Sequence, residues 1–304
     1  MRPTIHHRDG HHGWDRDREP ILEVSSGDVV EVHTIDAAGG QLDETSGAAD
    51  VADLDGERAN PLTGPIRVVG TQPGDVLAVH ILELHTSGWG WTANIPGFGL
   101  LSDDFPEPHL IHTRYDAEQL EFGDLATARP APFIGTIGVA PSAPGTHPVI
   151  PPRTVGGNLD LKDVGRDTTL LLPVAVDGAL LSLGDTHALQ GDGEVCGTAV
   201  ETPMEVVLRV DVLKDRSVES PQVVVPEPLP VPHGPYHVTT GVGPDLMTCT
   251  RDATRAMIDE LRRRGVDPRD AYLLCSVFGN LRIGEVVDAP NWVVAMEFPL
   301  AVLT

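Results

Sequence analysis

The stretch that decides the fold is GDVVEVH at residues 27–33, a Gly-Asp turn followed by an alternating run of β-branched residues. The pattern recurs as GDVLAVHI at residues 74–81, and residues 206–212 supply a third run of the same type. A turn signal before an alternating, valine-rich run is typical of a half-buried β-strand. Several such strands with turns between them predict a mainly β fold with a β-sandwich or jelly-roll-like core.

A proline-rich segment separates this expected core from the rest of the chain. Residues 221–235 contain six prolines, which predict a stiff, extended connector. We therefore expect two domains. The first is a β-sandwich core over residues 1–215 that carries the functional site, and the second is the connector with a smaller α+β part over residues 216–304.

The C-terminal part combines helical and strand patterns. Apolar residues at helical spacing predict a helix over residues 250–264. Asp267 and Pro268 form a capping residue and a first-turn proline, so a second helix is expected from there to about Val277. Strands are expected at 283–287 and 292–300.

The overall charge limits the classes of partner. The 304 residues carry a formal net charge of −24, which argues against nucleic acid and against an anionic membrane surface. The longest apolar run, residues 169–183, is interrupted by Asp177, so no membrane span is expected. Residues 1–17 lack the apolar segment of a secretory signal. Three cysteines do not make a disulfide scaffold and suggest a reducing, cytoplasmic compartment.

The most apolar run is expected to present a polar stretch to one edge of the core. Residues 170–183 predict two buried strands joined by a turn at Asp177-Gly178, a hairpin. The stretch GDTHALQGDGEVCGTAVE follows at residues 184–201. In an extended strand residues i and i+2 share a face, so Asp185 lies beside His187. Imidazole beside carboxylates suits a divalent metal or a base held by an acid, although a solvated hairpin turn would carry similar residues.

The same stretch resembles the signature of the acetamidase/formamidase family. Three other segments resemble that family, namely GGNLD at 156–160, PFIGTIGVAP at 132–141 and NPLTGP at 60–65. The resemblance extends from about Gly27 to about Arg282. It implies an amidohydrolase that cleaves a short-chain aliphatic amide of the formamide or acetamide type to a carboxylate and ammonia. It also raises the expectation that Asp160 belongs to the site.

Amide hydrolysis needs an activated nucleophile, a polarised carbonyl group and a proton for the leaving amine, and a bound divalent metal supplies the first two. We expect Asp160 and His187 as metal ligands together with a carboxylate from Asp185, Glu194 or Glu201, of which Asp185 is preferred, and this set leaves one position open at the metal. The residues expected to handle protons are Glu194, Glu201 and Asp192. The mixed oxygen and nitrogen donors favour zinc, with calcium or magnesium as alternatives if carboxylates dominate.

Two other interpretations remain open. Cys196, Glu201 and Lys162 are the residue types of a metal-free thiol amidase, in which the cysteine attacks the carbonyl carbon. A jelly-roll module that only binds a small ligand is the non-enzymatic alternative. Such a module would line its site with aromatics, and the polar stretch has none. Aromatic residues do occur in the Gly-rich stretch 89–98, where they either roof a pocket or plug one end of the sandwich. A small amide is the expected partner, together with further copies of the chain in a homo-oligomer.

Overall fold

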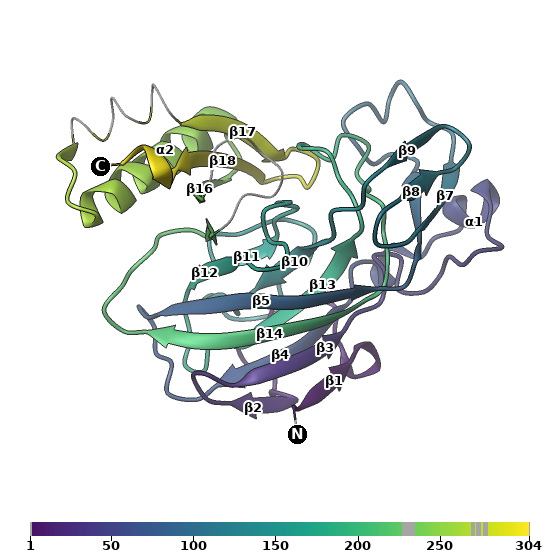
Figure 1. The fold of residues 1–304 in the computed structure, drawn as a ribbon. Coiled ribbons are helices and arrows are strands. Elements are labelled where there is room, and N and C mark those ends of the chain that lie inside the picture. Colours follow the sequence, from purple (N-terminus) through teal and green to yellow (C-terminus); the bar gives the residue numbers. More distant parts are fainter. Residues whose placement is uncertain (1, 227–234, 269–270, 272–274, 276–278, 304) are drawn as a thin grey trace.

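The computed structural model describes residues 2–226, 235–268, 271, 275 and 279–303. Two sheets face each other and form a sandwich (Figure 1). The larger sheet has nine strands, in the spatial order β1 (Thr4–His6), β3 (Val29–His33), β14 (Met204–Leu213), β5 (Val76–Thr86), β12 (Thr169–Pro173), β15 (Gln222–Val225), β16 (Tyr236–Gly243), β18 (Trp292–Pro299) and β17 (Asn280–Glu285). The smaller sheet has five, in the order β11 (Gly156–Asn158), β10 (Phe133–Gly138), β13 (Leu181–His187), β4 (Leu62–Val68) and β2 (Leu22–Val24).

The main hydrophobic core lies between these two sheets. Ile66, Ile137 and Leu183 from the smaller sheet pack in one cluster with Val79 and Leu208 from the larger sheet. Most strand pairs are antiparallel; the described parallel pairs are β1 with β3 and β2 with β4. The expected mainly β fold is confirmed.

The two Gly-Asp segments form matching turns before strands β3 and β5. Gly27 and Gly74 have positive φ angles of 92° and 97°, a backbone conformation that glycine adopts without steric cost. The carboxylates of Asp28 and Asp75 each accept the backbone N–H three residues earlier, at 2.7 Å. Such side-chain-to-backbone bonds are the reason that aspartate marks turns.

The prediction that residues 170–183 form a hairpin is wrong. Its two strands exist as β12 and β13, but β12 belongs to the larger sheet and β13 to the smaller one. Gly178, Ala179 and Leu180 have positive φ angles of 77°, 59° and 60°, and the chain crosses there from one sheet to the other. An apolar run marks both strands as buried, but it does not reveal which neighbour each strand pairs with.

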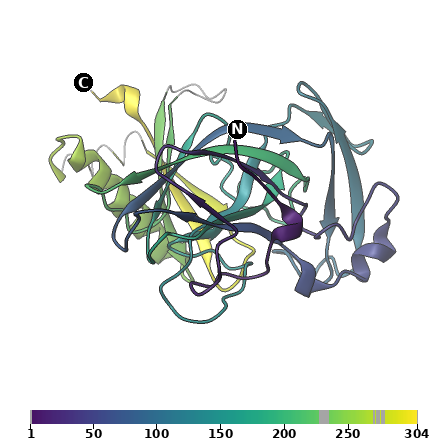
Figure 2. The ribbon, with the colours of Figure 1, turned by 90° about the horizontal axis from the view of Figure 1, so that it is seen from below.

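A four-stranded sheet projects from one end of the sandwich. It consists of β6 (Trp89–Asn94), β7 (His109–Tyr115), β8 (Leu120–Phe122) and β9 (Ala126–Ala128). The short helix α1 (Ala48–Ala52) contacts β7, in a segment with no helical signal in the sequence. Figure 2 shows this end of the molecule opposite the end that carries the long helix α2 (Leu246–Arg263). Three short 3-10 segments complete the described elements, at His7–Asp9, Gly56–Arg58 and Leu300–Val302.

The C-terminal strands continue the larger sheet. The prediction of an extended connector over residues 221–235 is partly wrong, because Gln222–Val225 forms β15, which pairs with β12 and β16. The rest of the connector falls largely on residues 227–234, outside the described residues. Helix α2 (Leu246–Arg263) confirms the first expected helix and starts earlier, where Asp245 accepts the Thr248 N–H at 2.7 Å. Most of the second expected helix lies outside the described residues. The division into 1–215 and 216–304 remains a prediction.

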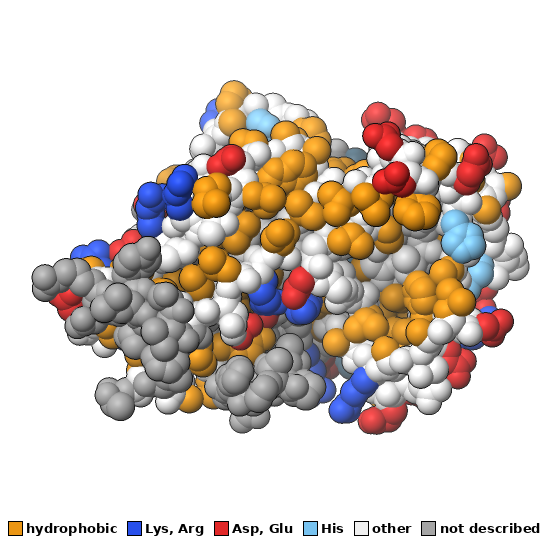
Figure 3. Space-filling model, turned by 90° about the horizontal axis from the view of Figure 1, so that it is seen from above, with side chains coloured by type: hydrophobic (Ala, Val, Ile, Leu, Met, Phe, Trp, Pro, Cys, Tyr) orange, Lys and Arg blue, Asp and Glu red, His pale blue; other side chains and the backbone are white. Residues whose placement is uncertain are grey.

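The surface combines charge with apolar areas. Figure 3 shows extended hydrophobic areas on the face seen from above, with Asp and Glu side chains gathered toward one edge. In the part of the chain that the structure describes, no helix is both long and apolar enough to cross a lipid bilayer.

Candidate functional site

The site is centred on His187, the last residue of strand β13. Asp185 and His187 lie two residues apart, and His187 Nε2 is 3.0 Å from Asp185 Oδ1. Glu201 pairs with His187 in an isolated β-bridge, which brings Glu201 Oε2 to 3.2 Å from the same nitrogen. All three side chains are at least 95% buried. Two carboxylates therefore face one ring nitrogen inside the protein.

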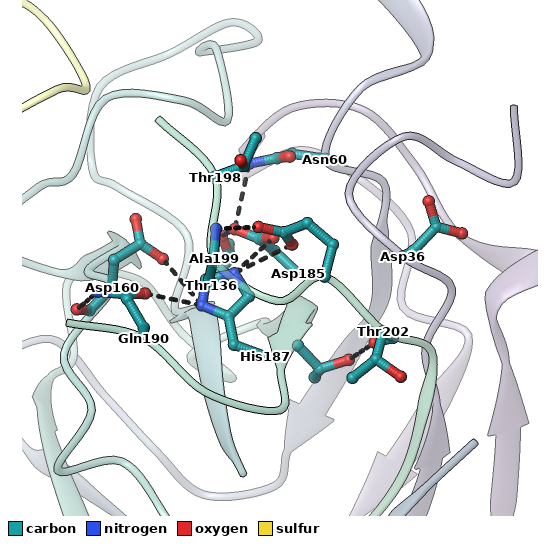
Figure 4. Close-up of polar contacts among 12 residues, drawn as sticks. Asp36, Asn60, Thr136, Asp160, Asp185, His187, Gln190, Thr198, Ala199 and Thr202 are labelled. Carbon is teal, nitrogen blue, oxygen red and sulfur yellow. Dashed lines mark hydrogen bonds and ion pairs between the residues drawn. The ribbon is translucent and has the colours of Figure 1, made fainter. Parts of the chain in front are cut away.

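Gln190 determines which nitrogen of His187 carries the proton. Gln190 Nε2 donates to the backbone carbonyl of Asp160 at 2.8 Å, so Gln190 Oε1 has to face the ring. That oxygen lies 2.9 Å from His187 Nδ1 and accepts the Nδ1 proton. Figure 4 shows Gln190 and Asp160 on one side of the ring and Asp185 on the other. In the neutral imidazole, Nε2 consequently presents its lone pair to the carboxylates.

Asp160 approaches the other side of the ring. Its Oδ1 lies 3.9 Å from His187 Nδ1, and Asp160 has a positive φ of 44° two residues after the end of strand β11. This approach depends on Gly135 of β10. A Cβ atom at Gly135 would lie 2.5 Å from Asp160 Oδ1 and 2.7 Å from His187 Cε1. Only glycine leaves room for the two side chains at this position.

Several residues that the sequence analysis did not assign complete the cluster. Thr136 Oγ1 donates to Asp185 Oδ2 at 3.1 Å, and Asn60 Nδ2 donates to the same oxygen at 3.3 Å. The Asn158 amide donates to the carboxylate of Asp288. Glu285 lies nearby and is fully buried. The family-like segments 60–65, 132–141 and 156–160 contain three of these residues, whereas nothing in the sequence around 285–288 marked them.

The cluster is strongly acidic. Burial, followed by the charges of neighbouring carboxylates, raises the pKa values of Asp160, Glu194 and Asp288 well above their usual values. Burial raises the pKa of Glu285 to about 7. Burial likewise raises the pKa of Glu201 to about 7, although the charge of His187 opposes this shift. The carboxyl groups therefore repel one another when all are ionised, and they need protons or a cation to be stable together.

For His187 and Asp185, the charge of the neighbouring side chains shifts the pKa against the effect of burial. Burial alone would lower the pKa of His187, but the carboxylates of Glu201 and Asp185 raise it well above its usual value. Burial would raise the pKa of Asp185, but the charge of His187 lowers it. Among the described residues, no Lys or Arg pairs with a carboxylate of this cluster, so His187 is its local source of positive charge.

The side chains fit a divalent cation. Ligand atoms held at about 2.0–2.2 Å around a tetrahedral zinc ion lie roughly 3.3 Å apart. The separations of Asp185 Oδ1 and Glu201 Oε2 from His187 Nε2, 3.0 and 3.2 Å, are close to that value. Asp160 Oδ1, Asp160 Oδ2 and Glu201 Oε2 are buried without a hydrogen-bond donor. Asp160, His187 and Glu194 form a second convergent set that shares the imidazole.

The structure does not bring Asp192 into this cluster. Its carboxylate binds Lys162 at 2.7 Å and Arg282 at 3.0 Å, and 29% of its side chain is exposed. Lys162 is thus engaged with Asp192, and the Sγ atom of Cys196 donates to the Thr198 carbonyl at 3.3 Å. The three residues of the thiol interpretation, Cys196, Glu201 and Lys162, thus have separate partners.

A cavity of about 280 Å³ opens onto the cluster. Asp185, Glu194, Glu201 and Asp288 are among the residues that line it. Trp91 and Phe98 also line it, so aromatics of the Gly-rich stretch form part of a pocket wall. A buried group of carboxylates around an imidazole, at the base of a pocket in a β-sandwich, is the arrangement of a hydrolytic site.

Comparison with known proteins identifies the family of this chain. It belongs to the Acetamidase/Formamidase family, whose model matches residues 2–149 and 143–304. It is 28% identical to a formamidase from Methylophilus methylotrophus, over 95% of this chain and 88% of that protein. It is 29% identical to an acetamidase from Mycolicibacterium smegmatis, over 67% of this chain and 66% of that protein.

Solved structures agree with this placement. The crystal structure of an acetamidase from Bacillus halodurans superimposes with a TM-score of 0.88 at 30% identity, covering 98% of this chain and 97% of that one. An acetamidase from Yersinia enterocolitica gives a TM-score of 0.87 at 30% identity, covering 100% of this chain and 94% of that one. The expected family and its fold are confirmed.

Proposed function

We propose that this protein hydrolyses the C–N bond of a linear amide at the His187 cluster and releases a carboxylate and ammonia. Membership of the family supports the reaction type, because the relatives named above are a formamidase and acetamidases. The pocket supports it as well, since a small neutral molecule can reach the carboxylates of Asp185, Glu194 and Glu201 there. A module that only binds ligands would not require such a costly concentration of buried acids.

We propose that Asp185, His187 and Glu201 hold a divalent metal ion, with zinc as the first candidate and calcium or magnesium as alternatives. Glu201, expected from the sequence either as a ligand or as a proton-handling residue, is assigned here to the ligands, and Asp160 lies on the far side of the ring. When bound, the ion would act as a Lewis acid and lower the pKa of water from 15.7 to about 7. Gln190 keeps the proton on His187 Nδ1 and so leaves Nε2 free as a donor atom.

We assign the remaining protein groups to proton handling and orientation. Glu194 lines the pocket, and its raised pKa lets it keep a proton that the leaving ammonia can take. Asn60 and Thr136 donate to Asp185 Oδ2, which fixes that carboxylate with its other oxygen toward His187. Asp192 has no part in this assignment, because Lys162 and Arg282 bind its carboxylate.

The observation that carries the proposal is the convergence of two buried carboxylates, from Asp185 and Glu201, on the Nε2 atom of the His187 imidazole. The test measures metal content by elemental analysis and ammonia release from formamide, acetamide and propionamide with zinc, manganese and calcium. We expect about one strongly bound ion per chain and activity that a chelator removes and the ion restores. No ammonia from any pairing of amide and metal would refute the proposed activity.

We further propose that the protein is cytoplasmic and forms a homo-oligomer. Cys196, Cys249 and Cys275 are free thiols, which a reducing compartment preserves. Leu101 and Phe105 are 53% and 61% exposed, and large exposed apolar side chains often mark contacts between subunits. Light scattering of the purified protein tests the assembly, and a monomer at micromolar concentration would contradict it.

A further inference from the structure

The pocket beside the His187 cluster is lined by two chemically different sets of side chains. One set consists of the carboxylates of Asp185, Glu194 and Glu201. The other set consists of large apolar residues that come from three separate parts of the chain. These residues are Leu54, Trp91, Ile95, Phe98 and Ile150.

The apolar walls are built into the fold. Trp91 is 1% exposed, and its Nε1 donates to Asp36 Oδ1 at 3.3 Å, which holds the indole in place. Leu54 and Ile95 pack against the same small cluster as Trp91. The Phe98 ring lies against Gly197, where a Cβ atom would come within 2.5 Å of it. These contacts fix the shape of the chamber before any ligand enters.

The chamber is larger than the smallest amides require. For scale, an apolar cavity of about 150 Å³ is enough to bind benzene, and this cavity has about 280 Å³. Formamide and acetamide have only three and four non-hydrogen atoms. Ordered water needs about two to four polar partners, which it finds near polar lining residues such as Asn60 and Thr198 but not beside the aliphatic and aromatic side chains. The space beside these walls therefore suits an apolar group of the ligand.

We propose that the substrate is a primary amide whose acyl group carries an apolar chain of roughly three to six carbons. This assignment rests on the proposed amide hydrolysis and specifies its substrate class. The amide group faces Asp185, Glu194 and Glu201, and the chain lies between Leu54, Ile95 and Ile150. In the reaction, water adds its oxygen to the carbonyl carbon, and the C–N bond breaks with its electron pair on nitrogen. One proton of the water passes to that nitrogen, so that ammonia leaves, and the proton of the resulting carboxylic acid then converts ammonia to ammonium. The products are a medium-chain carboxylate and ammonium.

The first measurement is kcat/KM for straight-chain amides from formamide to hexanamide. Burial of one methylene group is worth about a fourfold gain in binding, so kcat/KM should rise about fourfold or more per carbon up to pentanamide. A series in which amides are hydrolysed but formamide or acetamide is the best substrate would overturn this inference. It would leave the proposed function intact.

A variant at Ile150 tests whether the apolar lining causes the preference for longer acyl chains. Ile150→Phe places a larger side chain in the chamber and should lower the ratio of kcat/KM for pentanamide to that for acetamide by tenfold or more. Ile21→Phe, at a 40% exposed isoleucine that does not line the chamber, is the matched control and should keep the ratio. An equal ratio in Ile150→Phe and wild-type protein would count against the assignment.

A second readout does not depend on turnover. Calorimetric titration with the alkanols propanol to hexanol should give affinities that rise about fourfold per methylene, and Ile150→Phe should flatten the rise. If no amide is hydrolysed, both the proposed function and the proposed substrate class are refuted. Alkanol affinity that does not change with chain length would separately overturn the apolar chamber.

Discussion

Gln190 Oε1 lies 2.9 Å from His187 Nδ1, while the same amide donates to the Asp160 carbonyl at 2.8 Å. One side chain therefore fixes both the tautomer of the imidazole and the orientation of the ring. Partners of this kind typically contribute 10- to 100-fold to metal affinity, roughly the range expected here. Neither contact is visible in the sequence, where Gln190 is simply the polar residue before Gly191.

Gln190→Ala should weaken metal binding by about 10- to 100-fold, because Nδ1 loses its acceptor and the ring can turn. Competition with a chromophoric chelator measures this affinity. Gln119→Ala is the matched control, since that amide contacts only the exposed region around Glu121. Unchanged metal affinity in Gln190→Ala would show that the ring is fixed by other contacts.

His187→Ala and Cys196→Ser separate the metal mechanism from the thiol mechanism. Loss of the imidazole should reduce bound metal and lower the rate by about 100-fold or more. Cys196→Ser should keep most activity, with a stability cost of roughly 1–3 kcal/mol at most, because its Sγ contacts only Thr198. Activity and metal stoichiometry are measured on both variants. Full metal content and rate in His187→Ala, with loss of turnover in Cys196→Ser, would reverse the assignment.

The sequence predicted those parts of the fold that depend on local chemistry. The turns at Gly27 and Gly74 follow from glycine with positive φ and an aspartate that bonds to nearby backbone, so strands β3 and β5 were expected where they occur. The pairing of β12 and β13 was not predictable in this way. Whether two buried strands share a sheet depends on distant partners, and an apolar run carries no record of them.

The functional site likewise contains contacts that the local sequence predicts and contacts that depend on distant parts of the chain. The two-residue spacing of Asp185 and His187 in a strand predicted their contact, which the structure places at 3.0 Å. Glu285 and Asp288 could not be predicted, because they reach the cluster through a contact between Asp288 and Asn158, 130 positions away. Asp192 shares the acid-rich stretch but is turned away by Lys162. Composition locates a polar stretch, whereas tertiary contacts decide which of its members meet.

Gly135→Ala should disrupt the site with little disturbance elsewhere. Its Cβ would lie 2.5 Å from Asp160 Oδ1, 2.7 Å from His187 Cε1 and 2.8 Å from the Asp185 carbonyl oxygen. Overpacking of this kind costs about 1–3 kcal/mol, and here it displaces the side chains that meet at His187. Gly191→Ala is the control, because a Cβ there meets no atom within 4 Å. Calorimetric unfolding and metal affinity are the readouts, and equal metal affinity in both variants would refute the requirement for glycine.

The stability of the metal-free protein should fall as pH rises from about 4.5 to about 7. Burial raises the pKa of Glu285 from 4.5 to about 7, so between these values the folded protein holds a proton that the unfolded chain has lost. Stability is then fully present below pH 4.5 and is lost as pH rises through 7, by on the order of 3 kcal/mol for one such group. Glu285→Gln cannot ionise, so chemical denaturation at several pH values should give a shallower slope for this variant. Glu23→Gln, with a 64% exposed side chain, should keep the wild-type slope. If Glu285→Gln and wild-type protein show the same dependence on pH, the buried proton does not reside on Glu285.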